Sequence, residues 1–261
     1  MSYVMDSKEE NRRLREQAVA DPVGPRLLRT GLSAGMAALD LGCGPGVTSR
    51  AMASVVGPSG RVVGLDRSAA RIEDARRGAE LPNLEFLEGD AFRLPFADGE
   101  FDYCWSQFVF EYFADRAPAL RELWRVTRPG GTVVIADVDN SGFLNWPFPA
   151  ELEDGLRKLE GVLRSTGFDP CVGRKLFAEM RALGFAEVEV SVEPHYVYAG
   201  AADARSLADW RTRFEALEGL AAPAFGGQAA YRAFAEAFLQ FWASPDALKY
   251  SVLLVTRATR P

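Results

Sequence analysis

The stretch at residues 39–46, Leu-Asp-Leu-Gly-Cys-Gly-Pro-Gly, is the strongest constraint on what this chain can fold into. Glycine has no Cβ, so a turn that contains Gly42, Gly44 and Gly46 can adopt positive φ and let a ligand lie against bare peptide groups. The residues from Val47 to Val56 favour a helix, whose first N–H groups would face that turn. The stretch therefore predicts a strand that turns into a helix over a ligand.

The glycine turn alone does not identify the ligand, because three close glycines also occur in tight bends without a binding role. A dinucleotide-binding turn has the spacing G-x-G-x-x-G, and its third glycine would fall at position 47, which is Val47 in this chain. The observed spacing G-x-G-x-G therefore disfavours a nicotinamide-dependent oxidoreductase.

Carboxylates that follow two further apolar runs make a binding site the better interpretation of the turn. Asp66 ends the run at 61–66, about where the second strand of a doubly wound sheet ends, and an acid there can accept both ribose hydroxyls of an adenosine. Asp90 follows the run at 84–87 and is placed to bind an adenine amino group. The runs at 101–107 and 132–138 predict a fourth and a fifth strand.

With these motifs in order, residues 35–140 resemble the class I S-adenosylmethionine (SAM) dependent methyltransferases. The particular likeness is to the branch with the ubiquinone and menaquinone methyltransferases and many small-molecule methyltransferases of secondary metabolism. The resemblance implies an α/β fold with a Rossmann-like, doubly wound seven-stranded sheet, strand 7 antiparallel, and helical lid insertions. It implies SAM as cofactor, no metal, and methyl transfer to O, N or C of a small molecule. A SAM-binding protein without catalysis stays an alternative, because no motif identifies the acceptor.

The resemblance also implies a set of cofactor-binding residues. Asp40 and the glycine turn would hold the methionine end of SAM, Asp66 the ribose, and Asp90 with Ala91 the adenine. An N-terminal segment lies over the cofactor in similar enzymes; the alternative is a helix that only packs on the sheet. The complete expected set is Tyr3, Gln17, Asp40, Gly42, Gly44, Gly46, Asp66, Arg67, Asp90, Ala91 and Ser106.

The domain organisation expected from the sequence is an N-terminal helical cap at 1–34 and a SAM-binding domain at 35–261. Two helical inserts, at about 141–166 and 200–247, interrupt the domain. The second insert separates the sixth strand, 187–192, from the seventh, 251–256, and contains helices at 203–217 and 228–242 with an aromatic interior. Because it leaves the sheet at the ligand-binding edge, we expect a lid over the acceptor. A hairpin that packs on the sheet or on a second subunit is the alternative.

Three residues are candidates for catalysis: His195, Asp137 and Tyr112. His195, the only histidine, is expected just after the sixth strand, and Asp137 ends the fifth strand at the same edge. An imidazole is suited to proton removal near neutral pH; the alternative is a structural hydrogen bond in the lid hinge beside Tyr196 and Tyr198. Tyr112 belongs to an aromatic cluster after the fourth strand, which predicts either core packing or an acceptor contact.

Charge and composition argue against several other partners and sites. The net charge of −6 disfavours nucleic acid, which requires a basic face. Three separated cysteines and one histidine make no recognisable zinc site, and we expect reduced thiols in a cytoplasm. The sequence has no signal-peptide core and no apolar run long enough to span a bilayer. The expected protein is a cytoplasmic monomer or homodimer that acts on a small molecule.

Overall fold

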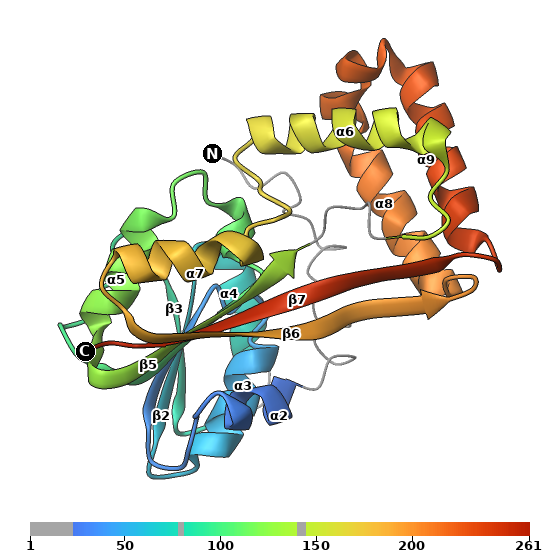
Figure 1. Ribbon diagram of the computed structural model, residues 1–261. Helices are drawn as coiled ribbons and strands as arrows, with labels where there is room; N and C mark the ends of the chain where they lie inside the picture. The colour runs from blue at the N-terminus through green and yellow to red at the C-terminus, as the bar shows by residue number, and fades with distance from the viewer. Residues whose placement is uncertain (1–22, 78–80, 140–144) are drawn as a thin grey trace.

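A seven-stranded sheet in the order β3-β2-β1-β4-β5-β7-β6 organises the structure (Figure 1). The computed structural model describes residues 23–77, 81–139 and 145–261; Tyr3 and Gln17 lie outside these residues. Neighbouring strands from β3 to β5 pair in parallel, and β7 pairs antiparallel with both β5 and β6. The predicted fold class, a doubly wound sheet with an antiparallel seventh strand, is therefore confirmed.

The strands are β1 (Ala37–Leu41), β2 (Arg61–Asp66), β3 (Leu84–Glu88), β4 (Phe101–Gln107), β5 (Thr127–Asp139), β6 (Ala186–Ala199) and β7 (Leu248–Thr259). The helices are α2 (Val23–Arg29), α3 (Val47–Val56), α4 (Ala69–Arg76), α5 (Ala117–Val126), α6 (Ala150–Ser165), α7 (Gly173–Ala182), α8 (Ala204–Ala221) and α9 (Gln228–Ala243), with short 3₁₀ helices η1 (Phe110–Tyr112) and η2 (Ala222–Phe225). Strand β2 and helix α3 have the bounds that the sequence predicts.

Both faces of the sheet are covered, because consecutive strand residues point to opposite sides and both sides are apolar. Ala38 and Val62 pack against α2 and α3, whereas their neighbours Leu39 and Val63 pack against α5 and α7. At the β3 edge, Ile72 of α4 packs on the sheet. This packing holds the carboxyl ends of the parallel strands in one line.

The sixth and seventh strands are longer than the predicted ranges 187–192 and 251–256, which is a correction to the sequence prediction. Their pairing continues to Ala199 and Leu248, so they form a ribbon that extends beyond the other strands toward α8 and α9 (Figure 1). An edge strand tolerates proline, and β6 continues past Pro194. His195 consequently lies within β6 rather than after it.

Helices α6, α8 and α9 form a helical insert with a core of its own, separate from the apolar clusters on the sheet. Its aromatic side chains pack closely, with the ring of Trp210 5.0 Å from Phe238 and 5.1 Å from Trp242 between centroids. A Cβ at Gly155 would lie 2.2 Å from Phe234, so glycine allows the close approach of α6 and α9. Within residues 23–77, 81–139 and 145–261, no helix is both long and apolar enough to cross a membrane.

Candidate functional site

A cavity of about 720 Å³ lies between the carboxyl edge of the sheet and the helical insert. Two parts of its wall, the glycine half and the aromatic half, differ in chemistry. The glycine half comprises residues 41–45, 47, 48, 65–68 and 89–92, which lie at and after the carboxyl ends of β1, β2 and β3. The aromatic half comprises residues 156–168 of α6 and the following turn, His195 and Tyr196 of β6, and residues 210–242 of α8 and α9 that face the cavity.

The glycine turn has the backbone that its sequence predicts, with φ of 76°, 51° and 77° at Gly42, Gly44 and Gly46. A Cβ at Gly42 would lie 2.2 Å from Val109, and one at Gly46 would lie 2.4 Å from Phe86. Both positions therefore require glycine for conformation and for space. Gly44 differs, because a Cβ there would meet no atom within 4 Å. Its peptide borders the cavity and is open to a ligand.

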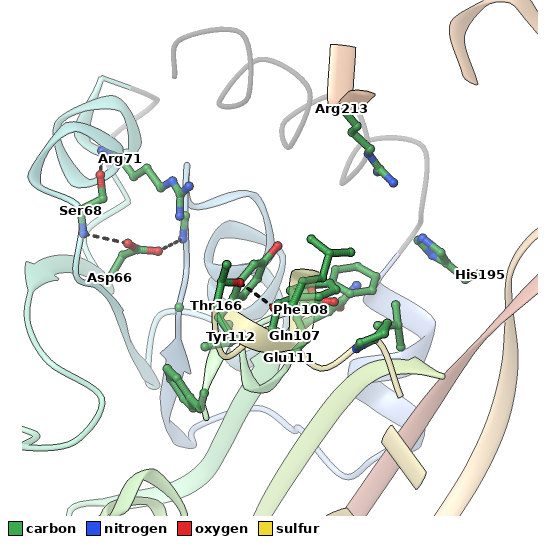
Figure 2. Close-up of a pocket in the computed structure, with 18 of the residues that line it drawn as sticks. Asp66, Ser68, Arg71, Gln107, Phe108, Glu111, Tyr112, Thr166, His195 and Arg213 are labelled. Atoms are coloured by element: carbon green, nitrogen blue, oxygen red, sulfur yellow. Dashed lines mark hydrogen bonds between the residues drawn. The ribbon is translucent and has the colours of Figure 1, made fainter. Parts of the chain in front are cut away.

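Asp66 connects the end of β2 to the glycine turn (Figure 2). Its carboxylate accepts hydrogen bonds from Gly44 N at 3.0 Å and from Ser68 N at 2.9 Å, and the residue is only 5% exposed. Each carboxylate oxygen has a second lone pair, so Asp66 can still accept bonds from a ligand in the cavity that it lines. The structure thus holds this acid rigidly beside the turn.

Six of the predicted cofactor residues line the same cavity: Gly42, Gly44, Asp66, Arg67, Asp90 and Ala91. Asp90 is exposed on its loop, where its Oδ1 accepts a hydrogen bond from Phe92 N at 2.9 Å. The structure brings these residues together from three separate strand ends, as the sequence pattern predicts.

Asp40, Gly46 and Ser106 are not among the residues that line the cavity. Asp40 is buried behind the turn and accepts a 2.5 Å hydrogen bond from Ser49 Oγ; burial raises the pKa of its carboxyl to about 7. Ser106 Oγ donates to the carbonyl of Leu41 at 3.0 Å. These residues support the turn in this structure, and their contact with a cofactor stays a prediction.

Of the three catalytic candidates, His195 and Tyr112 line the cavity and Asp137 does not. Asp137 is fully buried, and burial raises the pKa of its carboxyl to about 7. It accepts hydrogen bonds from Glu111 N at 3.2 Å and Val138 N at 2.9 Å. Asp137 therefore holds η1, and with it Tyr112, in place from below the cavity.

A shift in the register of β6 explains how His195 faces the cavity. The pairing with β7 shifts between Pro194 and Tyr196, so His195 is the extra residue of a β-bulge. Consecutive residues of a regular strand point to opposite faces, but here His195 and Tyr196 both line the cavity. The imidazole lies 5.1 Å from the ring of Phe108 and 5.6 Å from that of Tyr196, between centroids.

Several polar residues of the cavity were not predicted from the sequence: Gln107, Glu111, Glu160 and Arg213. The position of Arg213 could have been predicted from the sequence, because it lies three residues after Trp210 and four before Leu217, a spacing that places all three on one apolar face of a helix. Cys43, Cys104 and Cys171 are free thiols. In the part of the chain that the structure describes, no His, Cys, Asp or Glu cluster could hold a metal ion.

Comparisons of the sequence with known proteins match part of the chain. A family model described as a methyltransferase domain matches residues 32–185. An uncharacterized 37.1 kDa protein in transposon TN4556 of Streptomyces fradiae is 47% identical over 154 residues, which are 58% of this chain and 44% of that protein. A demethylmenaquinone methyltransferase of Staphylococcus aureus (strain JH9) is 40% identical over 108 residues, 41% of this chain and 45% of the relative. The chain thus spans less than half the length of these two relatives.

Solved structures extend the similarity to nearly the whole chain. A putative methyltransferase from Bacillus halodurans superposes with a TM-score of 0.60 at 18% identity, covering 91% of this chain and 98% of that one. A structure of the Haloferax volcanii Trm112 methyltransferase activator with a putative methyltransferase matches with a TM-score of 0.57 at 23% identity, covering 99% and 96%. At such identities the likeness shows the shared fold.

Proposed function

Because this chain belongs to the class I SAM-dependent methyltransferase family, we propose that it transfers a methyl group from SAM to a small-molecule acceptor of secondary metabolism. The observation that carries the proposal is the glycine half. A bare turn, the N-terminal end of α3 and two strand-end acids border one cavity, which is the chemistry that an adenosine with an amino-acid tail requires.

The residues of the glycine half fit the parts of SAM. The peptides of Gly42 and Gly44 are accessible to the methionine end, since neither residue carries a side chain toward the cavity. Asp66 has oxygen lone pairs for the ribose hydroxyls, and Asp90 with Ala91 would border the adenine. When bound, SAM supplies an electrophilic methyl group on a sulfonium.

The helical insert acts as a lid in this proposal, and the aromatic half holds the acceptor. Trp210, Phe214, Phe238 and Trp242 border the cavity; Trp210 is partly exposed, and the other three are buried behind it in the apolar core of the insert. Such a wall favours a flat apolar acceptor and excludes water, while the protein's main contribution to rate is to hold the acceptor at attack distance. The chain would then comprise a helical cap at 1–34 and a methyltransferase domain at 35–261, with inserts at about 141–166 and 200–247 over the acceptor.

His195 is the proposed general base for an acceptor that must lose a proton. Its ring borders the cavity at the bulge of β6, and imidazole accepts protons efficiently near neutral pH. Tyr112 contacts the acceptor from η1. Asp137 is a positioning residue, because it acts through the backbone of η1 and does not border the cavity.

Calorimetric titration with SAM, followed by a screen of ring-containing acceptors for the mass gain of one methyl group, tests the proposal. We expect SAM to bind, at least one acceptor to be methylated, and His195→Gln to lower turnover by about 10²-fold while SAM affinity is unchanged. Val197→Ala, on an exposed neighbour in β6, is the matched control. Absence of SAM binding would refute the proposal. SAM binding without turnover of any acceptor would favour a non-catalytic SAM-binding protein.

A further inference from the structure

One face of the ribbon formed by β6 and β7 carries a continuous row of apolar side chains. Residues paired across an antiparallel ladder point to the same face, so the register of β6 and β7 assigns each side chain to a face. Trp146 belongs to this face because it pairs with Leu248 in an antiparallel bridge. This surface, named the outer face, comprises Val190, Val192, Pro194, Val197 and Ala199 of β6, Leu248, Tyr250 and Val252 of β7, and Trp146.

The outer face is exposed, although its side chains are apolar. The exposed fractions are 76% for Trp146, 65% for Val192, 57% for Val197, 43% for Leu248 and 42% for Val190. These are five of the nine large apolar side chains that are exposed in the part of the chain that the structure describes. Single exposed apolar residues are normal, whereas such a concentration on one face marks an interaction surface.

The opposite face of the same ribbon is covered. Tyr196 and Tyr198 pack against the core of the helical insert, and Lys249, which pairs with Tyr198, is fully buried. On the side of the outer face, the first residue of α7 lies against β7, since a Cβ at Gly173 would be 3.0 Å from the Leu254 Cβ. The ribbon continues from there toward α8 and α9 (Figure 1). The insert therefore covers one face of the ribbon, and the outer face stays exposed.

The charge of the outer face decides which partner fits it. From the pair of Val190 and Thr256 to the pair of Ala199 and Leu248, every residue on this side of the ribbon is uncharged. A second copy presents the same uncharged surface, so the contact brings no like charges together although the chain has a net charge of −6. An anionic lipid surface instead attracts lysine and arginine, and the outer face contains neither.

The size of the outer face agrees with a dimer of moderate affinity. Its five exposed side chains present apolar surface on the order of 500 Å², so two copies would bury about 1,000 Å². That area is close to the lower limit for a specific interface. The free edge of β6 is less suited to pairing, because the exposed Glu187 and Glu189 lie on it and charges on an edge strand oppose the addition of another strand.

We propose that the protein forms a homodimer in which the outer faces of two copies pack on each other about a two-fold axis. Two sheet faces can pack in this way about 10 Å apart with their side chains interdigitated. The contact supports β6 from behind, and β6 is the strand whose His195 and Tyr196 line the cavity. The dimer is a property of the ribbon and does not depend on the proposed function.

Sedimentation equilibrium of the full-length protein, without SAM or an acceptor, tests the proposal. We expect a monomer–dimer equilibrium with a dissociation constant in the micromolar range, measured between about 1 and about 200 µM protein. Because the contact is apolar, the dimer should persist in about 1 M sodium chloride, where ion pairs are screened.

Val192→Glu and Trp146→Glu should each weaken the dimer by about 10-fold or more, because the two-fold axis brings two unpaired carboxylates into an apolar contact. Leu28→Glu is the matched control. Leu28 is 60% exposed on α2, outside the outer face, so this variant makes the same chemical change and should leave the dimer unchanged. If circular dichroism shows that a glutamate variant does not fold, Val192→Thr decides, since threonine keeps the branched shape and the strand preference and should weaken the dimer a few-fold.

Three results would overturn the proposal. The first is a wild-type protein that stays monomeric over the whole concentration range, and the second is a dimer of unchanged affinity in the outer-face variants. The third is a monomer that sediments with vesicles of phosphatidylcholine and phosphatidylglycerol and loses this binding in Val192→Glu, because a lipid surface would then take the place of the second copy. A dimer that does not bind SAM would refute the proposed function and leave the interface intact.

Discussion

The glycine half and the aromatic half of the cavity are built in different ways. The glycine half comes from three strand ends between residues 41 and 92, and its contacts are backbone groups and short acids held by backbone N–H groups. The aromatic half comes from side chains between residues 156 and 242, on β6 and on helices inserted after β5 and after β6. The first half depends on conformation that only glycine adopts easily, whereas the second depends on packing that several apolar residues can provide.

This difference indicates a division of labour. A ligand that is the same in every member of a family can be bound by backbone geometry, and the acceptor can then vary with the side chains of an inserted segment. The family model agrees with this interpretation, because its match ends at residue 185, before α8 and α9. The following experiments separate the two halves.

The largest effect is expected from removal of the α8–α9 hairpin. Gly200 N donates to Ala247 O at 3.0 Å, so a two-residue turn can replace residues 201–246 and join β6 directly to β7. Leu152, Leu156 and Leu159, which would become exposed, are changed to glutamine in the same variant. We expect SAM affinity to stay within a few-fold and methyl transfer to fall by about 10³-fold or more, because the acceptor loses its wall and water enters.

Calorimetry for SAM and mass spectrometry for the methylated product are the two measurements on the shortened protein. SAM binding serves as the check that the sheet is folded. Normal turnover by a shortened protein that binds SAM would show that the insert is not a lid.

The next largest effect is expected in the glycine half, from Gly42→Ala. The substitution costs about 1–2 kcal/mol for a positive φ and about 1–3 kcal/mol for crowding against Val109. Gly226→Ala is the control, since Gly226 has a left-handed φ of 84° but open space around its Cβ position. Denaturant unfolding should show a larger loss for Gly42→Ala than for Gly226→Ala, and SAM affinity should fall only in the former. Equal losses of stability would mean that contact with Val109 has no energetic role.

Asp66→Ala should weaken SAM binding by about 1–3 kcal/mol, the scale of a lost charge-assisted hydrogen bond. The substitution also leaves Gly44 N and Ser68 N without their acceptor, so part of the loss comes from the turn itself. Glu88→Ala is the matched control, because Glu88 pairs with Asp66 in the sheet register but does not line the cavity. Unchanged SAM affinity in Asp66→Ala would remove this residue from the site.

The last effect is on stability rather than on binding and concerns the two buried acids, Asp40 behind the glycine half and Asp137 below η1. Burial raises the pKa of each to about 7, far above the value of about 4 in an unfolded chain. Between these values the folded protein retains protons that the unfolded chain has released, so this contribution to stability is complete below about pH 4 and is lost as the pH rises toward 7.

The unfolding free energy of the wild-type protein should therefore fall as the pH rises through that range. In Asp137→Asn this fall should be less steep, by about 1 kcal/mol per pH unit. The exposed Asp154→Asn is the control and should leave the slope as in the wild-type protein. A slope that is the same in all three proteins would contradict the raised pKa of Asp137.

Much of the fold and the glycine half could be predicted from the sequence because their signals are local. The turn, α3 and the strand-end acids lie within short windows, and period-two or apolar runs identify β1 to β4. The limits of β6 and β7 could not be predicted, because their extension depends on pairing between residues far apart, such as Ala199 with Leu248.

By itself, the amino-acid sequence determined where the first strands lie along the chain, the glycine turn and the acids beside it, since each depends on neighbouring residues and on the backbone limits of glycine. Only the tertiary structure decided which way His195 and Arg213 point and that Asp137 is buried below η1. A bulge in β6 turns His195 toward the cavity, and the docking of α8 makes the stripe of Arg213 an inner surface. The direction of a side chain is set by the partner surface that its element meets, and that partner lies elsewhere in the chain.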